Sequence, residues 1–296
     1  MTDTMLLKNE LAVLVPSCDR YSDLWKPFFT LFWRFWPDCP YNVYLLSNRQ
    51  TCDIPGIKGV LVGDDVSWSD TVRTGVAGLR EDYILLFLED LFLCAHVKAT
   101  TVEKVLNWML DSQANYVRLN PSVPPDKPCN DFVGVVSKGT IYRTSTVLSA
   151  WKKQTLLDLL RPGESAWEFE TEGSVRSDSY DSFYSTWEEC FPVINGVVKS
   201  KWRRDAVSRI RSLGVVVDVV ARPVMTRRDA VMFQLKQERS KLLRLFPAMH
   251  RRALRDWFLP ETGFHRKPLN YQLLKGEHLT EAMVSCTKNP KEQEYD

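Results

Sequence analysis

The chain has 296 residues, of which 44% are hydrophobic and 26% are charged, which suits one large globular domain with or without a smaller appendage. The formal net charge of +2 excludes a nucleic-acid binder that works through its overall charge, and the seven scattered cysteines, none in CxxC spacing, indicate neither a zinc site nor a disulfide framework. No signal peptide and no stretch of about 20 apolar residues is visible, so we expect a cytoplasmic protein.

Short apolar runs alternate with helical patterns through the first half of the chain. The run 11–15, closed by Pro16, predicts a buried strand, and an aromatic-rich amphipathic helix follows it as far as Pro37. Strands that alternate with helices at this spacing predict an α/β fold, with a mostly parallel sheet covered by helices on both faces. The further strands are expected over 41–48, 59–65, 83–88 and 115–121, and the helices over 67–79 and 100–112, the last starting with a capping-box pattern from Thr100 to Glu103.

Polar residues follow the ends of the first four predicted strands. In a parallel sheet ligands bind beyond the carboxyl ends of the strands, so these residues predict a ligand site. The alternative is that loops are polar in any protein. The residues are Ser17 to Arg20, Ser47 and Asn48, Asp64 and Asp65, and Glu89 and Asp90.

The second half of the chain changes in character. Residues 136–145 are expected to form a strand or hairpin, and 149–163 a helix. A further helix is expected to start at Ser165, with Glu168 as its capping-box partner. A turn-centred segment with two lysines follows over 193–202.

The carboxyl-terminal part is basic. From Arg222 to Phe258 there are ten lysines and arginines against three acidic residues, which predicts helices with a basic face. We therefore expect a main domain over 1–220 and a basic helical appendage over 221–296.

Glu89 and Asp90 lie inside one of the most apolar stretches, "DYILLFLEDLFLCAHV". Charged groups are costly in such surroundings unless something neutralises them. Two carboxylates at a strand end can bind Mg²⁺ or Mn²⁺, act as an acid and base, or pair with a lysine or arginine. A bound cation would bridge the carboxylates to the phosphates of a nucleotide diphosphate.

Five ordered segments carry a family resemblance: "VPSCDRYSDLWKPFF…WPDCPYNVYLLSN", "WSDTVRTGV", "YILLFLEDLFL", "AWKKQTLLDLLRPGESAWEFE" and "INGVVKSKW". Together they resemble a family of bacterial glycosyltransferases of surface-polysaccharide and lipopolysaccharide gene clusters, related to the GT-A fold, over residues 11–203. GT-A enzymes hold a nucleotide-sugar on an α/β sheet and usually carry an Asp-x-Asp metal motif. This chain has Glu89 and Asp90 without a third acidic residue.

The resemblance implies a nucleotide-sugar donor, a UDP-sugar first of all, and a glycan or lipid-linked acceptor. The loop from Pro16 to Tyr21 would contact the base and ribose, and Glu89 and Asp90 would bind the diphosphate or its Mg²⁺ or Mn²⁺. Core packing remains the alternative for Trp68, and a solvated helix face for Arg73. The residues expected at the donor are Pro16, Ser17, Asp19, Arg20, Asn48, Trp68, Ser69, Arg73, Glu89, Asp90, Lys199 and Lys201.

Inverting sugar transfer needs a carboxylate that takes the proton of the acceptor hydroxyl. "SAWEFE" offers Glu168 and Glu170, which lie about 200° apart around a helix, so only one is expected to face the site. Glu168 has a capping role, which favours Glu170 as the base and an inverting mechanism. Lys199 or Lys201 would stabilise the departing phosphate, or would be exposed lysines on a turn.

One other function remains open, and two more lack support in the sequence. The incomplete acidic motif fits a non-catalytic protein that binds nucleotide-sugars or carbohydrates. A nucleotidyltransferase would need a glycine-rich loop after the first strand, and "PSCDRYSD" has no glycine. A nucleic-acid role would rest on the basic tail alone, and we expect none.

The tail from Thr226 to Phe258 would bind the inner face of an anionic membrane peripherally, or would pack on the main domain or on a second subunit.

Overall fold

The computed structural model describes residues 9–233 of the chain. Most of the predicted basic appendage lies outside these residues, so its helices and its membrane contact stay predictions, as does the domain boundary at 220. Within 9–233 no helix is both long enough and apolar enough to cross a membrane.

The strands of the main sheet are β1 (Leu11–Pro16), β2 (Asn42–Ser47), β3 (Ile57–Leu61), β4 (Tyr83–Leu86), β6 (Tyr116–Arg118), β7 (Lys127–Pro128), β8 (Val133–Val135), β9 (Ser149–Lys152) and β10 (Phe183–Thr186). Short pairs are made by β5 (Leu91–Leu93) with β11 (Val193–Asn195), and by β12 (Val197–Val198) with β13 (Lys201–Trp202). The helices are α2 (Ser22–Phe35), α3 (Trp68–Ala77), α4 (Ala99–Asp111), α5 (Lys153–Leu159), α6 (Ala166–Glu168), α7 (Ser174–Arg176) and α8 (Arg204–Ser212). Single turns are η1 (Asp19–Tyr21), the π-helical η2 (Phe169–Gly173) and η3 (Ser177–Ser179).

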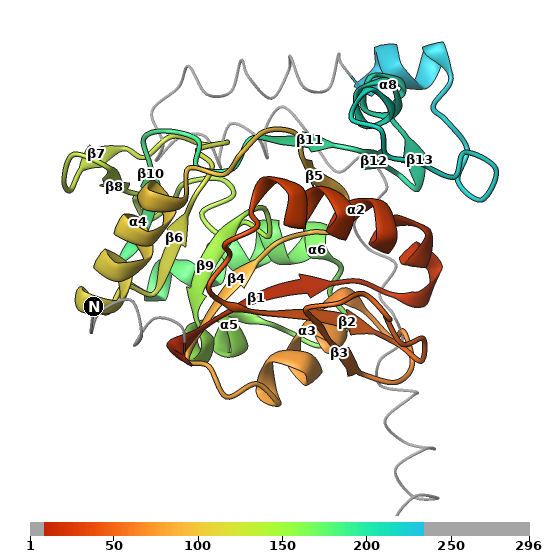
Figure 1. Cartoon of the computed structure of the whole chain (residues 1–296). Coiled ribbons are helices and arrows are strands. Elements are labelled where there is room, and N and C mark those ends of the chain that lie inside the picture. Colours follow the sequence, from red (N-terminus) through yellow and green to blue (C-terminus); the bar gives the residue numbers. More distant parts are fainter. Residues whose placement is uncertain (1–8, 234–296) are drawn as a thin grey trace, which may run out of the picture. The chain divides into compact units, whose positions relative to one another are not determined.

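The main sheet has nine strands in the order β3-β2-β1-β4-β9-β6-β10-β8-β7. β1 pairs in parallel with β2 and with β4, so that Val13 lies between Val43 and Leu85. β6 pairs in parallel with β10, whereas β9 and β8 run against their neighbours. The predicted α/β class, with a mostly parallel sheet flanked by helices, is confirmed (Figure 1).

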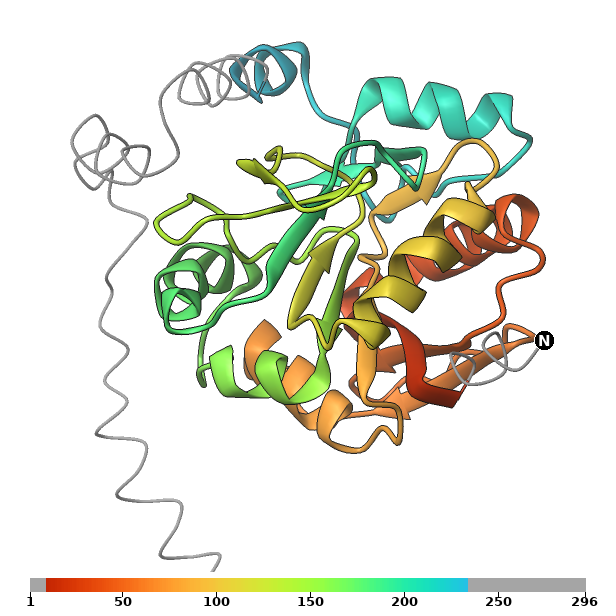
Figure 2. The ribbon, with the colours of Figure 1, turned by 90° about the vertical axis from the view of Figure 1, so that its left-hand side faces the viewer.

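Helices cover both faces of the sheet, as Figures 1 and 2 show. Successive residues of a strand point to opposite faces. Val13 and Val15 of β1 therefore pack in one core with α2 and α4, while Ala12 and Leu14 pack in a second core with α3 and α5. Burial on both faces explains why β1 and β4 read as continuous apolar runs, and it leaves the strand ends as the place for polar residues.

Three local predictions are wrong. Residues 136–145 form turns rather than a strand, and Ser149–Lys152 forms β9 rather than the start of a helix. β9 fills the place between β4 and β6, where Trp151 lies between Ile84 and Tyr116, so sheet pairing overrides the helical pattern there. In α4 the cap position is Lys98, and no side chain caps the helix, so the Thr100 capping box does not form.

Candidate functional site

The loops that follow β1 and β2 are tied to each other at the carboxyl edge of the sheet. The backbone amide of Asn48 donates to Asp19 Oδ1 at 3.0 Å, and the amide of Asp19 donates to Asn48 Oδ1 at 3.0 Å. Asn48 Nδ2 also donates to the carbonyl of Gly63, beyond β3, at 3.0 Å. The sequence prediction that these strand ends come together is therefore confirmed in the geometry.

Asp19 shapes this edge through its carboxylate. Besides Asn48, the backbone amides of Arg49 and Gln50 donate to it at 3.1–3.2 Å. A carboxylate that accepts several amides fixes the loop around it. Asp19 and Asn48 thus act as loop organisers, and a contact of Asp19 with a base or ribose stays a prediction.

Two of the predicted arginines lie in solvent. Arg20 pairs with Asp65 at 2.8 Å with 80% of its side chain exposed, and Arg73 pairs with Asp70 at 3.7 Å with 50% exposed. Exposed pairs of this kind add about 0–1 kcal/mol to stability. Both arginines can therefore leave their partners for an anionic ligand at small cost.

Glu89 and Asp90 form the turn between β4 and β5, and they are partly buried. Ser17 Oγ donates to Glu89 Oε1 at 3.2 Å, which joins the turn to the end of β1. Asp90 Oδ1 is buried and has no hydrogen-bond partner among the residues that the structure describes. The turn therefore contains a buried acceptor oxygen without a partner there, which is uncommon in folded proteins.

Burial shifts the proton affinity of this pair. Loss of solvent, and then the charge of Asp90, raises the pKa of Glu89 to about 8, and loss of solvent raises the pKa of Asp90 to about 7. The pair therefore tends to hold a proton near neutral pH unless a positive charge stands beside it. Such a shift in a strand-end turn is typical of a functional site.

Arg222 supplies part of that positive charge. It is 5% exposed, and its charge lowers the pKa of both Glu89 and Asp90. Its guanidinium donates to the two oxygens of Asp23 at 2.8 and 3.0 Å, and lies 4.2 Å from the centre of the Tyr21 ring. Sequence analysis missed this residue because Arg222 and Asp23 are 199 positions apart. The sequence does show that Arg222 follows the largely apolar stretch "VVVDVVA", a pattern that indicates a partly buried arginine.

The lysine-bearing turn also reaches the site. Tyr21 and Ser200 share a hydrogen bond of 3.1 Å between their hydroxyls, which places the β12–β13 turn beside the loop after β1. Lys199 and Ser200 both have positive φ angles, 49° and 59°, which close this tight turn. Lys201 pairs with Asp229 at 2.9 Å, so its charge is already compensated.

Trp68 and Ser69 open α3 on the other side of the sheet. The Trp68 ring lies 5.4 Å from the ring of Phe169 in a tilted contact, as expected from core packing. Ser69 is buried, its hydroxyl has no hydrogen-bond partner within 9–233, and its amide donates to the carbonyl of Glu164 at 3.0 Å. A contact of either residue with a nucleotide stays a prediction.

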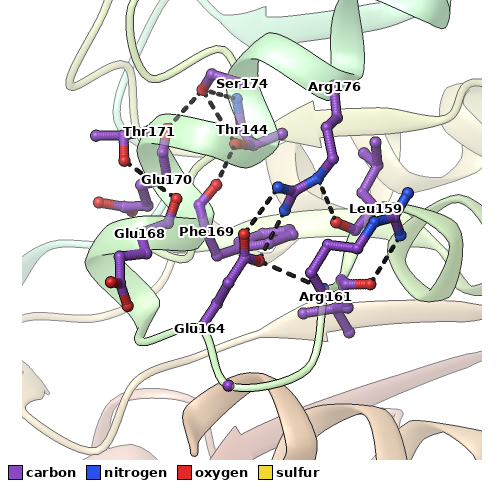
Figure 3. A network of polar contacts seen from close by, with 12 residues as sticks. Thr144, Leu159, Arg161, Glu164, Glu168, Phe169, Glu170, Thr171, Ser174 and Arg176 are labelled. Carbon is purple, nitrogen blue, oxygen red and sulfur yellow. Dashed lines mark hydrogen bonds and ion pairs between the residues drawn. The ribbon is translucent and has the colours of Figure 1, made fainter. Parts of the chain in front are cut away.

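Glu168 and Glu170 have different surroundings. Glu168 closes the predicted capping box, because its Oε2 accepts from the Ser165 amide at 2.8 Å and the Ser165 hydroxyl at 2.7 Å. Glu170 lies in the π-helical turn η2, and Figure 3 shows this segment in its polar network. π-helical turns occur often at functional sites. The capping role predicted for Glu168 is therefore confirmed, and the role of Glu170 as a base stays a prediction.

Three donors hold Glu170 Oε1: the Ser145 hydroxyl at 3.0 Å, the Thr146 amide at 2.8 Å and the Thr146 hydroxyl at 3.0 Å. These residues lead into β9, whose first residue, Ser149, pairs with Leu86 at the carboxyl end of β4. Glu170 is therefore fixed to the same edge of the sheet as the Glu89–Asp90 turn.

Comparison with protein-family models finds no match, and no curated protein matches the chain. Solved structures of similar shape include S. aureus TarS 1-349, at 12% identity over 62% of this chain and with a TM-score of 0.43. A second is the mannosyltransferase PcManGT from Pyrobaculum calidifontis in complex with GDP-Man and Mn²⁺, at 13% identity over 94% of this chain and 81% of that chain, with a TM-score of 0.43. A third is UTP-bound UGPase from Acinetobacter baumannii, at 9% identity over 77% of this chain and 99% of that chain, with a TM-score of 0.46. This chain spans 59% of the length of the TarS structure. At these identities and TM-scores the likeness carries no conclusion about activity.

Proposed function

We propose that this protein is a glycosyltransferase that moves a sugar from a nucleotide-sugar donor to a glycan or lipid-linked acceptor. The observation that carries the proposal is the Glu89–Asp90 turn, with its buried, unpartnered Asp90 Oδ1 and its raised pKa values, at the edge where the loops after β1 and β2 meet. A nucleoside diphosphate would lie across these loops, with its phosphates toward the turn. A role in surface-polysaccharide synthesis follows from the sequence resemblance alone.

The residues at the turn fit a hard divalent cation. Among residues 9–233 no group of three or more His, Cys, Asp or Glu side chains is placed to hold a metal, so the protein would supply the two carboxylates only. Mg²⁺ usually takes one or two carboxylates from the protein and completes its shell with waters and substrate phosphates, and all donors here are oxygens. Glu89 and Asp90 would hold Mg²⁺ or Mn²⁺, which would neutralise charge on the diphosphate leaving group.

The protein itself fixes the turn from two sides. Ser17 donates to Glu89, and Arg222 places a positive charge near both carboxylates while it is held by Asp23. Lys199 comes close to the loop after β1 through the Tyr21–Ser200 bond and would add positive charge near the departing phosphate.

Glu170 would be the general base of an inverting transfer. Its Oε1 is occupied by three donors, and within 9–233 no hydrogen bond to its Oε2 is seen, so Oε2 is the oxygen able to take a proton from an acceptor hydroxyl. The fixed Oε1 holds the carboxylate in one orientation, which a base needs if it is to meet a bound hydroxyl.

The test is a donor panel. The full-length protein would be incubated with UDP-, GDP-, CDP- and TDP-sugars, with and without Mn²⁺, and nucleotide release followed. Asp90→Asn should weaken donor binding in the presence of Mn²⁺, because it removes one of the two carboxylates that would hold the cation. The control is Asp111→Asn, which should behave as the wild type. Asp111 is an exposed carboxylate at the carboxyl end of α4, outside the proposed donor site. Binding without any hydrolysis or transfer would favour the non-catalytic alternative, and no binding of any nucleotide would refute the proposal.

A further inference from the structure

Polar contacts tie the helical turns α6, η2 and α7 to neighbouring segments, and Figure 3 shows several of them. Arg176 makes two hydrogen bonds of 2.7 Å to the carboxylate of Glu164. The carbonyl of Glu164 accepts from the Ser69 amide at 3.0 Å, and Ser174 Oγ accepts from the Thr144 amide at 3.0 Å. The segment is therefore fixed to the start of α3 and to the loop before β9.

Two large apolar side chains are exposed on this segment, Val175 of α7 at 47% and the much larger Trp167. Trp167 of α6 is 71% exposed, whereas Trp25, Trp36 and Trp151 are buried in the cores. The capping box between Ser165 and Glu168 defines the start of the helix, so Trp167 points outward from an ordered turn. An indole kept in water on a rigid backbone is a feature of binding surfaces, where tryptophan contributes a large share of the affinity.

Trp167 lies one helical turn before Glu170. Thr171 Oγ1 donates to the carbonyl of Trp167 at 3.1 Å, so helical geometry continues through this turn. Residues three apart on a helix are surface neighbours, with Cβ atoms about 5–6 Å apart. Trp167 is α-helical and Glu170 belongs to the π-helical turn η2, so the two residues lie within about one turn of each other on this segment.

The charge of the surroundings selects the ligand. Residues 161–176 contain four glutamates and two arginines, and Arg176 is neutralised by Glu164. Glu168, Glu170 and the exposed Glu172 then stand against Arg161 alone, so the segment around Trp167 keeps a net negative charge, which disfavours an anionic group. A neutral ring with many hydroxyls fits, because the C–H groups on one face of a pyranose pack on the electron-rich face of an indole.

We propose that Trp167 is the platform on which an uncharged pyranose of the acceptor stacks and presents a hydroxyl to Glu170. The proposal rests on the glycosyl transfer proposed above, since it takes Glu170 as the base. The stacking itself needs no turnover, so binding and catalysis are separable by experiment.

The experiment is saturation-transfer NMR on the full-length protein with UDP present. The probes are the methyl glycosides of glucose, galactose and N-acetylglucosamine, with methyl glucuronide as the anionic probe. Trp167→Ala should weaken binding of the neutral glycoside that the wild type binds best by about 10-fold, and Trp167→Phe should keep most of it. Trp187→Ala is the matched control. Trp187 follows β10 and is 40% exposed, and its Nε1 donates to the Asn130 carbonyl at 3.3 Å. The glucuronide should bind more weakly than the glucoside.

The proposal is overturned if Trp167→Ala binds as the wild type does, if the glucuronide binds as tightly as the glucoside, or if the wild type binds no neutral glycoside. Trp167-dependent glycoside binding without any donor binding or hydrolysis would support the platform while refuting the transfer function, so the two failures are distinguishable.

Discussion

Replacing Arg222 by methionine should destabilise the protein and disturb the carboxylate turn. Methionine keeps much of the apolar stem, so the change removes mainly the charge and its donors. Breaking one side of a buried ion pair costs about 3–5 kcal/mol, because the partner stays buried without compensation. The Arg222 and Asp23 side chains are 6% and 15% exposed, so Asp23 can recover some hydration, and we expect a loss of about 2–4 kcal/mol.

The assay is urea unfolding of Arg222→Met, Asp23→Asn and the double variant. The double variant should be less destabilised than the sum of the two single variants by at least about 1 kcal/mol, since it leaves no orphaned charge. Arg20→Met is the matched control: the Arg20–Asp65 pair is also 2.8 Å long but is exposed, so its loss should cost below about 1 kcal/mol. A loss at Arg222 below about 1 kcal/mol, or strict additivity with Asp23→Asn, would refute this account of the pair.

Three further predictions follow from the same geometry. The folded-state pKa values of Glu89 and Asp90, about 8 and 7, lie above their ordinary values of 4.5 and 3.8, so this pair binds more protons in the native state than in the unfolded chain. The contribution of the pair to stability without cations should therefore fall as pH rises from about 4 to about 8. Asp90→Asn should flatten that decline in thermal melts recorded across this range, and an unchanged slope would contradict the assignment. Gly196→Ala should cost about 1–3 kcal/mol in urea, because a Cβ there would lie 2.3 Å from Phe92 Cε2, whereas Gly59→Ala meets no atom within 4 Å and should be nearly silent. Glu170→Gln should lower the transfer rate by about 10²- to 10⁴-fold with donor affinity unchanged in calorimetry, and if Glu168→Gln shows that signature instead, the base is Glu168.

The elements that the sequence predicts correctly are those decided by local patterns. The apolar run 11–15, closed by Pro16, predicts a buried strand, and β1 is that strand. The capping box from Ser165 to Glu168 is likewise local, since donor and acceptor stand three residues apart. Residues 149–163 were predicted as one helix, but they form a strand and then a helix. The strand β9 forms because it pairs with β4 and β6, and no local property of Trp151 predicts that pairing.

In the site, too, the sequence predicts what depends on local patterns and misses what depends on contacts between distant residues. The carboxylates at the end of β4 could be predicted, because a charged pair inside an apolar run is visible in the sequence. The contacts that set their properties could not, since Ser17 and Arg222 reach them from 72 and more than 130 positions away. Of the residues that donate to Glu170, Ser145 ends the segment 136–145, for which the sequence predicted the wrong structure, and Thr146 follows it without a prediction.

The electrostatics of the turn limit how a diphosphate can bind there. Glu89 and Asp90 bring up to two negative charges, and Arg222 offsets them only in part because its guanidinium also neutralises Asp23. A diphosphate would add further negative charge at short range, so binding requires that the pair be neutralised, either by protons or by a cation that arrives with the donor. The two routes respond oppositely to pH. Because protons leave the pair as pH rises through about 7 to 8, nucleoside diphosphate affinity measured by calorimetry without divalent cations should fall over that range, while the gain in affinity on adding Mn²⁺ should grow. Affinity that ignores both pH and Mn²⁺ would mean that the diphosphate lies away from this turn.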